Sequence, residues 1–576
     1  MSIQRYLFLI LLLTGSLLAS GCQDESIEGT TATLPSTNPS PSPSQPDPVI
    51  PIDTSSENGN NINSPLGINS NFVIDWTPEW VFVDAFKSSR KWISGTTGGS
   101  WNDGRALDVD ENGWIRSLQP DQVAHTLMFW SANGHYPSGQ YTVMYDGEGT
   151  LQYGSGARYN AALSQPGRHV IDVDASRGGI QLTVSATNPA NPIRNIRVIM
   201  PGGVCSNNPF QWCSDNNACS NGATCESFVD NYSTQIFHPT FLDRIKRYRV
   251  YRFMNWMRTN DSPQRDWANR PKPTDAHWST ENGVPVEVMV ALANRLHADP
   301  WFSLPHQATD DYVRRFAEVV RDRLAPDLKV YIEHSNEVWN GIFGQSNYAE
   351  QRGLSLGLST DPNRARAYYH SLRSVQIFDI FASVFGGNER LVRVMGSQSS
   401  SSWLSRQLLE YQNAYLKTDA LAIAPYFGYY LGRASEEQRV EAMTVDELIA
   451  ELRDVAIPGA IDAIRTQSGI AREFGVMLTA YEGGQHLVGV GSPANNPTIN
   501  ALFDAVNRDP RMASLYTLYL NGWRDNGGQM FVNYLGAGRY NRYGRWGSLE
   551  YQDQPAATAP KFRALMDFIQ NNPQWW

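Results

Sequence analysis

The feature that most restricts the fold is a repeating alternation of short apolar strand patterns and amphipathic helical patterns after residue 250. In the segment 310–324, for example, apolar side chains recur at spacings of three and four residues, as on one face of a helix. Alternation of this kind predicts parallel strands joined by crossover helices, and seven such repeats plus one earlier strand predict a closed eight-stranded α/β barrel. The seven strand patterns are 250–253, 301–304, 330–332, 391–395, 421–424, 476–480 and 530–533.

Two segments could supply the first barrel strand. In one arrangement it is 66–69, followed by the helical pattern 82–87, and a separate β-rich unit is inserted after them. In the other it is 196–200, with 239–248 as its helix. Both arrangements give eight strands, so the sequence leaves the choice open.

Residues 65–200 have a different character, with short strand patterns separated by Gly, Pro and Asp-Gly turns. Regular spacing of this kind is typical of an all-β sandwich, so we expect a jelly-roll-like module here. Residues 65–92 could belong to it or supply the first barrel strand. The module's strand patterns are 126–129, 141–145, 169–173, 180–184 and 196–200.

Polar residues follow two of the barrel strand patterns. Asn336 and Glu337 come after 330–332, with Trp339 close behind, and Glu482 follows 476–480 and precedes two glycines. A glutamate in this position can hold a proton over a glycosidic oxygen, the asparagine can bind a neighbouring hydroxyl, and the tryptophan can stack on a pyranose face. Two such glutamates, with two strand patterns between them, therefore predict a site that cleaves glycosidic bonds.

From about residue 200 to 576 the chain resembles the clan A glycoside hydrolases, which are retaining (β/α)8 TIM-barrel enzymes. It is also similar to a group of bacterial proteins described as cellulose-binding or glycosidase-like. The stretches that carry this resemblance are Arg-Phe-Met-Asn-Trp-Met at 252–257, Asp-Pro-Trp-Phe at 299–302 with Pro305 and His306, and Ser-Asn-Glu-Val-Trp-Asn at 335–340.

The resemblance implies roles for individual residues. Glu337 after strand 4 is the expected acid/base and Glu482 after strand 7 the expected nucleophile, with carboxyl groups about 5–5.5 Å apart. Arg252 would keep the nucleophile ionised, and Tyr426 would hydrogen-bond to it. The remaining expected substrate-binding residues are Asn255, His306 and Asn336, with Trp256, Trp339 and Trp523 as stacking candidates.

Two features of the sequence depart from the family pattern or need a separate explanation. The tryptophan usual after strand 8 is missing, because the strand continues as Met-Phe-Val-Asn-Tyr at 530–534, which leaves the sugar-stacking platform unassigned. Glu333 lies four residues before Glu337, and we expect it inside the barrel, paired with Arg252 or Arg393, rather than in the chemistry.

The first 64 residues predict export. Residues 1–21 have the pattern of a signal peptide, and Gly21-Cys22 ends a run that resembles a bacterial lipoprotein box. Lipidation of Cys22 would anchor the chain to a membrane through lipid only, with the outer membrane or cell surface favoured. Residues 22–64 are rich in Ser, Thr and Pro and predict an extended tether.

Setting Cys22 aside leaves four cysteines, all within the loop 205–225. In an oxidising compartment Cys205, Cys213, Cys219 and Cys225 predict two local disulfides in one of three connectivities. A zinc site is the alternative, but the spacing lacks paired Cys-x-x-Cys ligands and no histidine lies in the loop. We therefore expect no metal and no cofactor.

The charge composition restricts the classes of molecule that the protein can bind. The chain has 47 Lys and Arg against 57 Asp and Glu, a net charge of −10, and no basic stripe, which argues against nucleic acid. The residues and the resemblance together predict a retaining glycoside hydrolase acting on β-linked polysaccharide or oligosaccharide. A noncatalytic surface glycan-binding lipoprotein is the main alternative, and a structural envelope protein is a third possibility. The β-rich module would bind carbohydrate through Trp92, Trp101 or Trp114, or serve as a scaffold; the sugar and the oligomeric state stay open.

Overall fold

The computed structural model describes residues 61–576. Eight parallel strands close into a barrel, in which β21 pairs with β20 on one side and with β1 on the other. The predicted α/β barrel is therefore confirmed. In order around the barrel the strands are β1 (Leu66–Asn69), β15 (Val250–Arg252), β16 (Asp299–Leu304), β17 (Val330–His334), β18 (Leu391–Gly396), β19 (Ala420–Ile423), β20 (Met477–Ala480) and β21 (Phe531–Asn533).

The structure decides which segment is the first strand. Residues 66–69 form β1, in register with β15 through Gly67 and Val250, whereas 196–200 falls largely in β11 (Arg194–Ile199) of the inserted module. The helical pattern expected at 82–87 is only a 3₁₀ turn at Ala85–Ser88. The first crossover helix is instead α2 (Pro239–Ile245), so the second arrangement named the right helix and the wrong strand.

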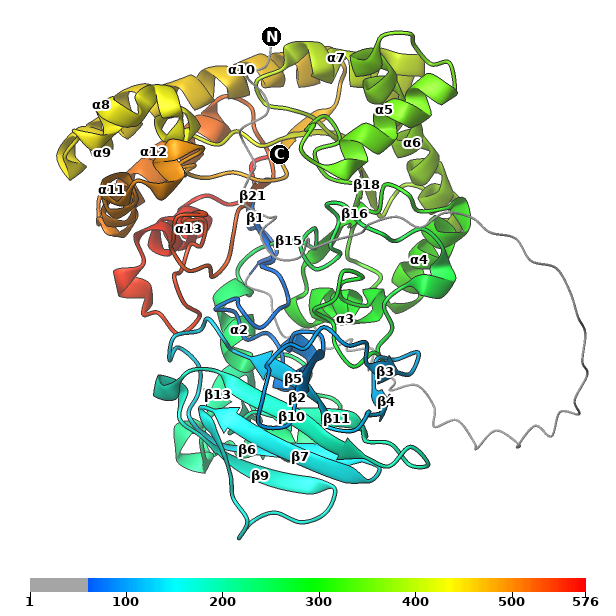
Figure 1. Cartoon of the computed structure of the whole chain (residues 1–576). Coiled ribbons are helices and arrows are strands. Elements are labelled where there is room, and N and C mark those ends of the chain that lie inside the picture. The colour runs from blue at the N-terminus through cyan, green and yellow to red at the C-terminus, as the bar shows by residue number, and fades with distance from the viewer. Residues whose placement is uncertain (1–60) are drawn as a thin grey trace, which may run out of the picture.

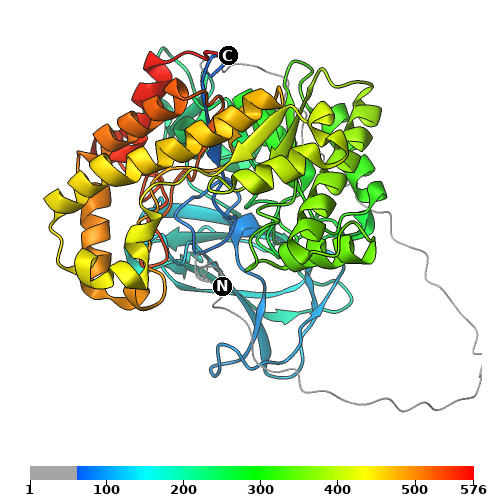
Figure 2. The ribbon, with the colours of Figure 1, turned by 90° about the horizontal axis from the view of Figure 1, so that it is seen from above.

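Helices wrap the outside of the barrel (Figures 1 and 2). In α4 (Asp310–Arg323), Thr309 caps the first turn by accepting from the backbone N–H of Tyr312, and Val313, Phe316 and Val320 are buried. The other helices are α1 (Phe228–Asn231), α3 (Val286–Leu296), α5 (Gly344–Ser355), α6 (Pro362–Phe385), α7 (Ser402–Glu410), α8 (Glu437–Glu441), α9 (Val445–Glu451), α10 (Ile457–Glu473), α11 (Pro497–Arg508), α12 (Met512–Asp525) and α13 (Pro560–Asn571).

Large apolar side chains fill the barrel interior. Val250, Trp301, Tyr331, Val394 and Val532 come from five different strands and form one buried cluster. A barrel filled in this way is a packed core with no open channel, so a ligand can reach polar side chains only at its ends.

The segment between β1 and β15 carries a β-sandwich, seen below the barrel in Figure 1. One sheet has the order β2 (Ile93–Thr96), β5 (Gln122–Met128), β10 (Ile180–Thr187), β7 (Gly149–Ser155). The other has the order β11, β6 (Gly139–Asp146), β9 (Arg168–Val173), β8 (Ala157–Tyr159). Strands β5, β6 and β7 alternate between the two sheets, as in a jelly roll. A short ribbon of β3 (Asp108–Val109) and β4 (Ile115–Ser117) accompanies them.

The cysteine-rich loop is a small antiparallel sheet within this insertion, where the sequence had assigned it to the barrel unit. Its strands are β12 (Gly203–Cys205), β13 (Asn208–Cys213) and β14 (Cys225–Ser227). Two disulfides, Cys205–Cys219 and Cys213–Cys225, hold it together, so both predicted bridges form and one connectivity is selected.

The insertion packs on loops of the barrel. The side chain of Gln552 exchanges two hydrogen bonds with the backbone of Trp80, and the backbone of Ala276 donates to that of Asn112. These contacts involve the loops that follow β15 and β21. The module therefore packs directly against the barrel.

The three tryptophans named for carbohydrate binding differ in exposure. Trp114 is buried and stacks on Phe86, which excludes it from a binding surface. Trp92 is half-buried and packs on the same phenylalanine, while Trp101 is 37% exposed and stacks on His125. A role for Trp101 in binding stays a prediction.

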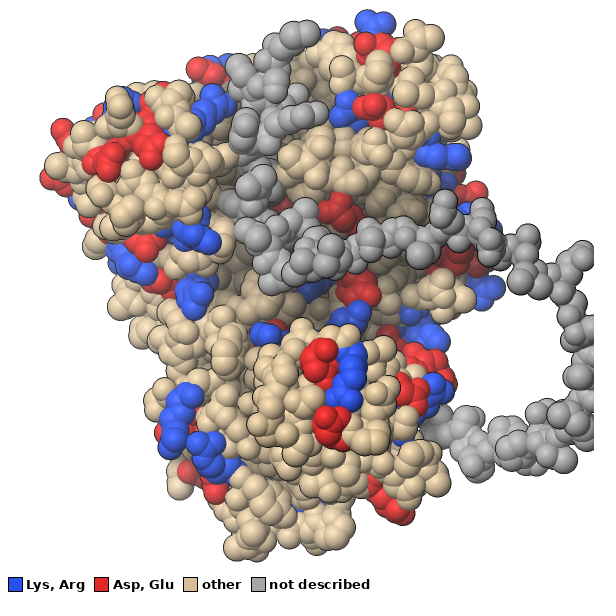
Figure 3. All heavy atoms as spheres, viewed as in Figure 1, with Lys and Arg blue, Asp and Glu red and all other residues tan. Residues whose placement is uncertain are grey.

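On the face in Figure 3, positive and negative side chains are interspersed and form no stripe of one sign. Within residues 61–576, none of the helices combines the length and the apolar character that crossing a membrane requires. The predicted signal peptide, Cys22 and nearly all of the tether lie outside the described residues.

Candidate active site

The two predicted catalytic glutamates lie just beyond the C-terminal ends of their strands, Glu337 after β17 and Glu482 after β20. Both are buried, with exposures of 8% and 3%. Since all strands of the barrel are parallel, these ends meet at one mouth, where barrel sites form.

Arg252, the last residue of β15, links the polar groups at this mouth. Its guanidinium is fully buried and donates to Glu482 Oε1 at 3.0 Å and to Glu333 Oε2 at 2.8 Å. It also donates to the side-chain oxygens of Asn336, at 2.9 Å, and Asn69, at 3.2 Å. One arginine therefore fixes the position of two carboxylates and two amides.

Glu333 lies inside the barrel, as predicted, and its partner is Arg252. Trp301 Nε1 and Ser303 Oγ also donate to its Oε2, at 2.9 and 3.0 Å. Arg393, the other partner considered, pairs with Asp419. Glu333 therefore serves as a buried counterion of Arg252.

Glu337 is held differently. Tyr481 donates to its Oε1 at 3.0 Å, and Asn340 donates to its Oε2 at 2.9 Å. Its backbone has φ +42°, and that of Ser335 has φ +60°. Side chains disfavour this left-handed region, and such residues concentrate at functional sites.

The two glutamates have unlike electrostatic surroundings. Burial raises the pKa of Glu337, opposed by the hydrogen bonds from Asn340 and Tyr481. Burial also raises the pKa of Glu482 to about 7, with Arg252 and Tyr426 opposing the shift and the charge of Glu337 adding to it. The guanidinium of Arg252 and the hydroxyl of Tyr426 bond directly to Glu482 and favour its ionised form, whereas the direct partners of Glu337 are neutral donors.

Of the predicted substrate-binding polar residues, Asn336 and Tyr426 hydrogen-bond within this group, while Asn255 and His306 follow the ends of β15 and β16 at the same mouth. Tyr426 donates to Glu482 Oε2 at 3.0 Å, and Asn255 donates to the backbone oxygen of Ser70 at 2.7 Å. Asn255 Oδ1 and His306 Nδ1 are buried and have no hydrogen-bond partner within residues 61–576. Burial lowers the pKa of His306 to about 4, so its imidazole is neutral at pH 7.

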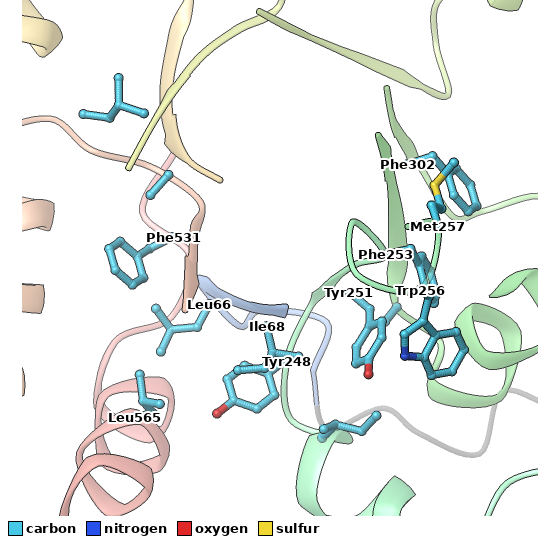
Figure 4. Close-up of a cluster of buried hydrophobic side chains, with 14 of the residues drawn as sticks. Leu66, Ile68, Tyr248, Tyr251, Phe253, Trp256, Met257, Phe302, Phe531 and Leu565 are labelled. Carbon is cyan, nitrogen blue, oxygen red and sulfur yellow. The ribbon is translucent and has the colours of Figure 1, made fainter. Parts of the chain in front are cut away.

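Of the three predicted stacking residues, only Trp339 lies beside the two glutamates. It is half-buried, and its ring centre is 6.2 Å from that of Tyr481. Trp256 is 1% exposed and packs among Tyr251 and Phe253 in the apolar core (Figure 4), and Trp523 on α12 is fully buried. Both of those stacking assignments are wrong, because neither ring has a free face.

Trp546, in the loop after β21, is a residue that the sequence did not indicate. It is half-buried, and its ring centre lies 5.6 Å from that of Tyr426 and 5.9 Å from that of Tyr534. It stands 13 positions beyond the end of β21, Asn533, so strand counting could not find it. Trp546 is the strongest candidate for the stacking platform missing at the strand end.

Within residues 61–576, the single group of side chains spaced like metal ligands consists of Cys205, Cys213 and Cys219. All three sulfurs are committed to disulfides, and a disulfide sulfur offers no thiolate to a metal. This cluster therefore does not fit zinc.

No family model and no curated protein sequence matches the chain. Several solved structures are similar to it. One is a 4-O-α-L-rhamnosyl-β-D-glucuronidase from Fusarium oxysporum 12S, at 11% identity and a TM-score of 0.33, covering 55% of this chain and 61% of that one, less than two thirds of its length.

Two others are also glycoside hydrolases. The endo-β-1,4-mannanase from Thermotoga petrophila is 10% identical, with a TM-score of 0.31, over 57% of this chain and 72% of that one. The β-glucuronidase from Ruminococcus gnavus is 9% identical, with a TM-score of 0.32, over 85% of this chain and 68% of that one. Likenesses this distant assign no activity, so function has to be argued from the residues at the barrel mouth.

Proposed function

We propose that the protein is a retaining glycoside hydrolase that cleaves β-linked polysaccharide or oligosaccharide. The observation that carries the proposal is the unequal setting of two buried glutamates at the ends of β17 and β20. Glu482 contacts the guanidinium of Arg252, whereas Glu337 accepts its hydrogen bonds from the neutral donors Tyr481 and Asn340. Environments that separate the protonation states of two carboxyls divide them into an acid and a nucleophile.

The mechanism follows from this division. Glu337, protonated, donates its proton to the glycosidic oxygen while Glu482, ionised, attacks the anomeric carbon and forms a glycosyl ester. The Glu337 carboxylate then removes a proton from water as that water attacks the ester, which restores both groups and retains the anomeric configuration.

Tyr426 and Arg252 act on the nucleophile in both steps. Their hydrogen bonds, each 3.0 Å, favour the ionised form of Glu482 and hold its two oxygens in fixed directions. The unpaired Asn255 Oδ1 and His306 Nδ1 are acceptors or donors suited to sugar hydroxyls. Trp339 and Trp546 supply the apolar faces on which a pyranose ring can stack.

We also propose that the enzyme is an exported lipoprotein, anchored through Cys22 and carried on the Ser- and Pro-rich tether. A tether of this composition would let the barrel reach polysaccharide at a distance from the membrane.

The deciding experiment is product analysis of the purified protein on β-glucan, mannan, xylan and galactan, with the anomeric configuration of new reducing ends followed by NMR. The proposal predicts β-configured first products on at least one of these glycans. First products of α configuration would show that the enzyme inverts the anomeric configuration and would contradict the retaining mechanism. If the protein binds a glycan and releases no product, the noncatalytic glycan-binding alternative replaces the hydrolase.

A further inference from the structure

Arg258 lies in the loop that leaves β15, between two residues that contact the site. Three positions before it, Asn255 donates to the backbone oxygen of Ser70 at 2.7 Å. Two positions after it, Asn260 accepts from Asn336 Nδ2 at 3.1 Å. Arg258 is therefore held at the same mouth of the barrel as the two glutamates, on the side of β1 and β15.

The guanidinium of Arg258 has few partners. It donates to the backbone oxygen of Ser279 at 3.1 Å and lies 4.7 Å from the ring centre of Phe72. Within residues 61–576 no carboxylate comes within ion-pair distance of it. Glu281 acts on it electrostatically, but both oxygens of Glu281 are bound by Lys91 at 2.8 Å.

A half-buried cation without a carboxylate partner is costly in a folded protein. Burial lowers the pKa of Arg258 to about 10, so the side chain still carries its charge at neutral pH. Elsewhere at the mouth, Arg252 has two carboxylate partners. Within residues 61–576, the charge of Arg258 therefore has no carboxylate in direct contact and can pair with an anionic group of a ligand.

The surroundings of Arg258 suit a charged sugar. Phe72 is half-buried, and Trp76, 43% exposed, has its ring centre 6.0 Å from that of Phe72. Arg258 has φ +48° and Asp261 has φ +55°, which repeats in this loop the left-handed backbone found at Ser335 and Glu337. Aromatic faces next to a guanidinium fork can bind a pyranose ring and its carboxylate or sulfate together.

We propose that Arg258, with Phe72 and Trp76, forms a subsite that selects glycans carrying a negatively charged sugar unit. The inference rests on the proposed function, because it places this unit in the substrate of the same site. The anionic group can be the carboxylate of a uronic acid or a sulfate ester, both of which accept hydrogen bonds from a guanidinium.

The test compares β-linked oligosaccharides of one linkage and length that differ in a single unit, which is a neutral hexose, the corresponding hexuronate or a sulfated hexose. We expect the wild-type kcat/KM for one of the charged forms to exceed that for the neutral form by about 10- to 100-fold, the range of a charge-assisted hydrogen bond. We also expect added salt to reduce this preference. The ratio between the two charged forms identifies the anionic group.

Three variants assign the preference to this residue. Arg258→Gln removes the charge and should lower the charged-to-neutral ratio by about tenfold or more, and Arg258→Lys, which keeps the charge without the planar fork, should lower it less. The matched control is Arg465→Gln, which makes the same charge change at a side chain that is 61% exposed on α10 and should leave the ratio as in wild type. Thermal unfolding checks that each variant is folded.

Binding separates this inference from the proposed function. In Glu482→Gln protein, calorimetry should show tighter binding of the charged oligosaccharide, dependent on Arg258, even if the wild-type protein hydrolyses nothing. If the wild-type protein used the neutral oligosaccharide as well as or better than both charged forms, the subsite would be overturned and the hydrolase would remain. A preference for a charged form that did not respond to salt would also overturn the subsite. Equal losses on charged and neutral substrates in folded Arg258→Gln protein would overturn it as well.

Discussion

The hydroxyl of Tyr481 donates a 3.0 Å hydrogen bond to Glu337, a residue 144 positions away in the sequence. The next residue, Glu482, is the proposed nucleophile. One dipeptide just beyond the end of β20 therefore contacts the proposed acid/base through its first side chain and supplies the proposed nucleophile with its second. The relative position of the two catalytic groups depends on this strand end.

Tyr481→Phe tests this contact. The hydrogen bond favours the ionised form of Glu337, so its loss should raise the pKa of that carboxyl further. Activity requires protonated Glu337, and the alkaline limb of the kcat/KM profile should therefore move to higher pH, by about one unit for a hydrogen bond to a charged group. An alkaline limb at the wild-type position would mean that Tyr481 only fills space.

The two glutamates should respond differently to substitution. Glu482→Gln removes the nucleophile and should abolish turnover on every substrate. Glu337→Gln removes proton donation and should cost about 10²- to 10⁴-fold on natural glycans, but much less on aryl glycosides with activated phenols, which leave without a proton.

Azide distinguishes the two roles, because it needs no general base. It should rescue Glu337→Gln on activated aryl glycosides and give a β-configured glycosyl azide, identified by NMR. An α-configured adduct would exchange the two assignments, and wild-type activity in either variant would remove that residue from the mechanism.

Glu79 gives a prediction about stability. It is buried, it accepts from the backbone N–H of Ala537 at 2.7 Å, and burial raises its pKa to about 7. Because the folded state holds the proton up to about pH 7 and the unfolded state only up to about 4.5, the folded state binds more protons between these values. Stability should therefore fall as pH rises from 4.5 to 7, by about 3 kcal/mol from this group.

Glu79→Gln keeps the acceptor for Ala537 and removes the titration. Urea unfolding of both proteins across this pH window should show a flatter dependence in the variant. Parallel curves would show that Glu79 does not titrate with folding.

The disulfides predict a specific peptide map. Digestion without reduction should yield Cys205 joined to Cys219 and Cys213 joined to Cys225, with no reactive thiol among the four in native protein. Each bridge closes a loop of 12 or 14 residues, so reduction should cost the local sheet about 3 kcal/mol per bridge. Free thiols or bound zinc in exported protein would contradict this assignment.

Export through Cys22 is tested by cell fractionation. Wild-type protein should sediment with membranes, and Cys22→Ser should prevent lipidation and shift the protein out of the membrane fraction. Ser20→Ala, which keeps a small residue two positions before the cysteine, is the matched control and should stay with the membranes. Wild-type protein that is already soluble would end the lipoprotein proposal.

Local pattern was sufficient for much of the fold. Helix and strand periods depend on neighbouring residues, so the alternation after residue 250 predicted seven of the eight barrel strands and placed Glu337 and Glu482 at strand ends. The same reasoning put Glu333 inside the barrel, since it falls within the strand and not beyond its end. The resemblance then supplied the roles of Arg252 and Tyr426.

What the pattern could not decide depended on contacts between distant segments. Both 66–69 and 196–200 look like strands locally, and only pairing with β15 and β21 makes the first of them the barrel strand. Trp256 and Trp523 were assigned to a sugar platform because tryptophans serve that purpose, but both rings are enclosed by core side chains. Trp546 comes to the mouth because a long loop folds back over it. Apart from the short pattern at 82–87, the sequence determined which segments form the barrel's helices and strands, because those preferences are local, whereas the tertiary structure decided which side chains are exposed, paired or left without a partner.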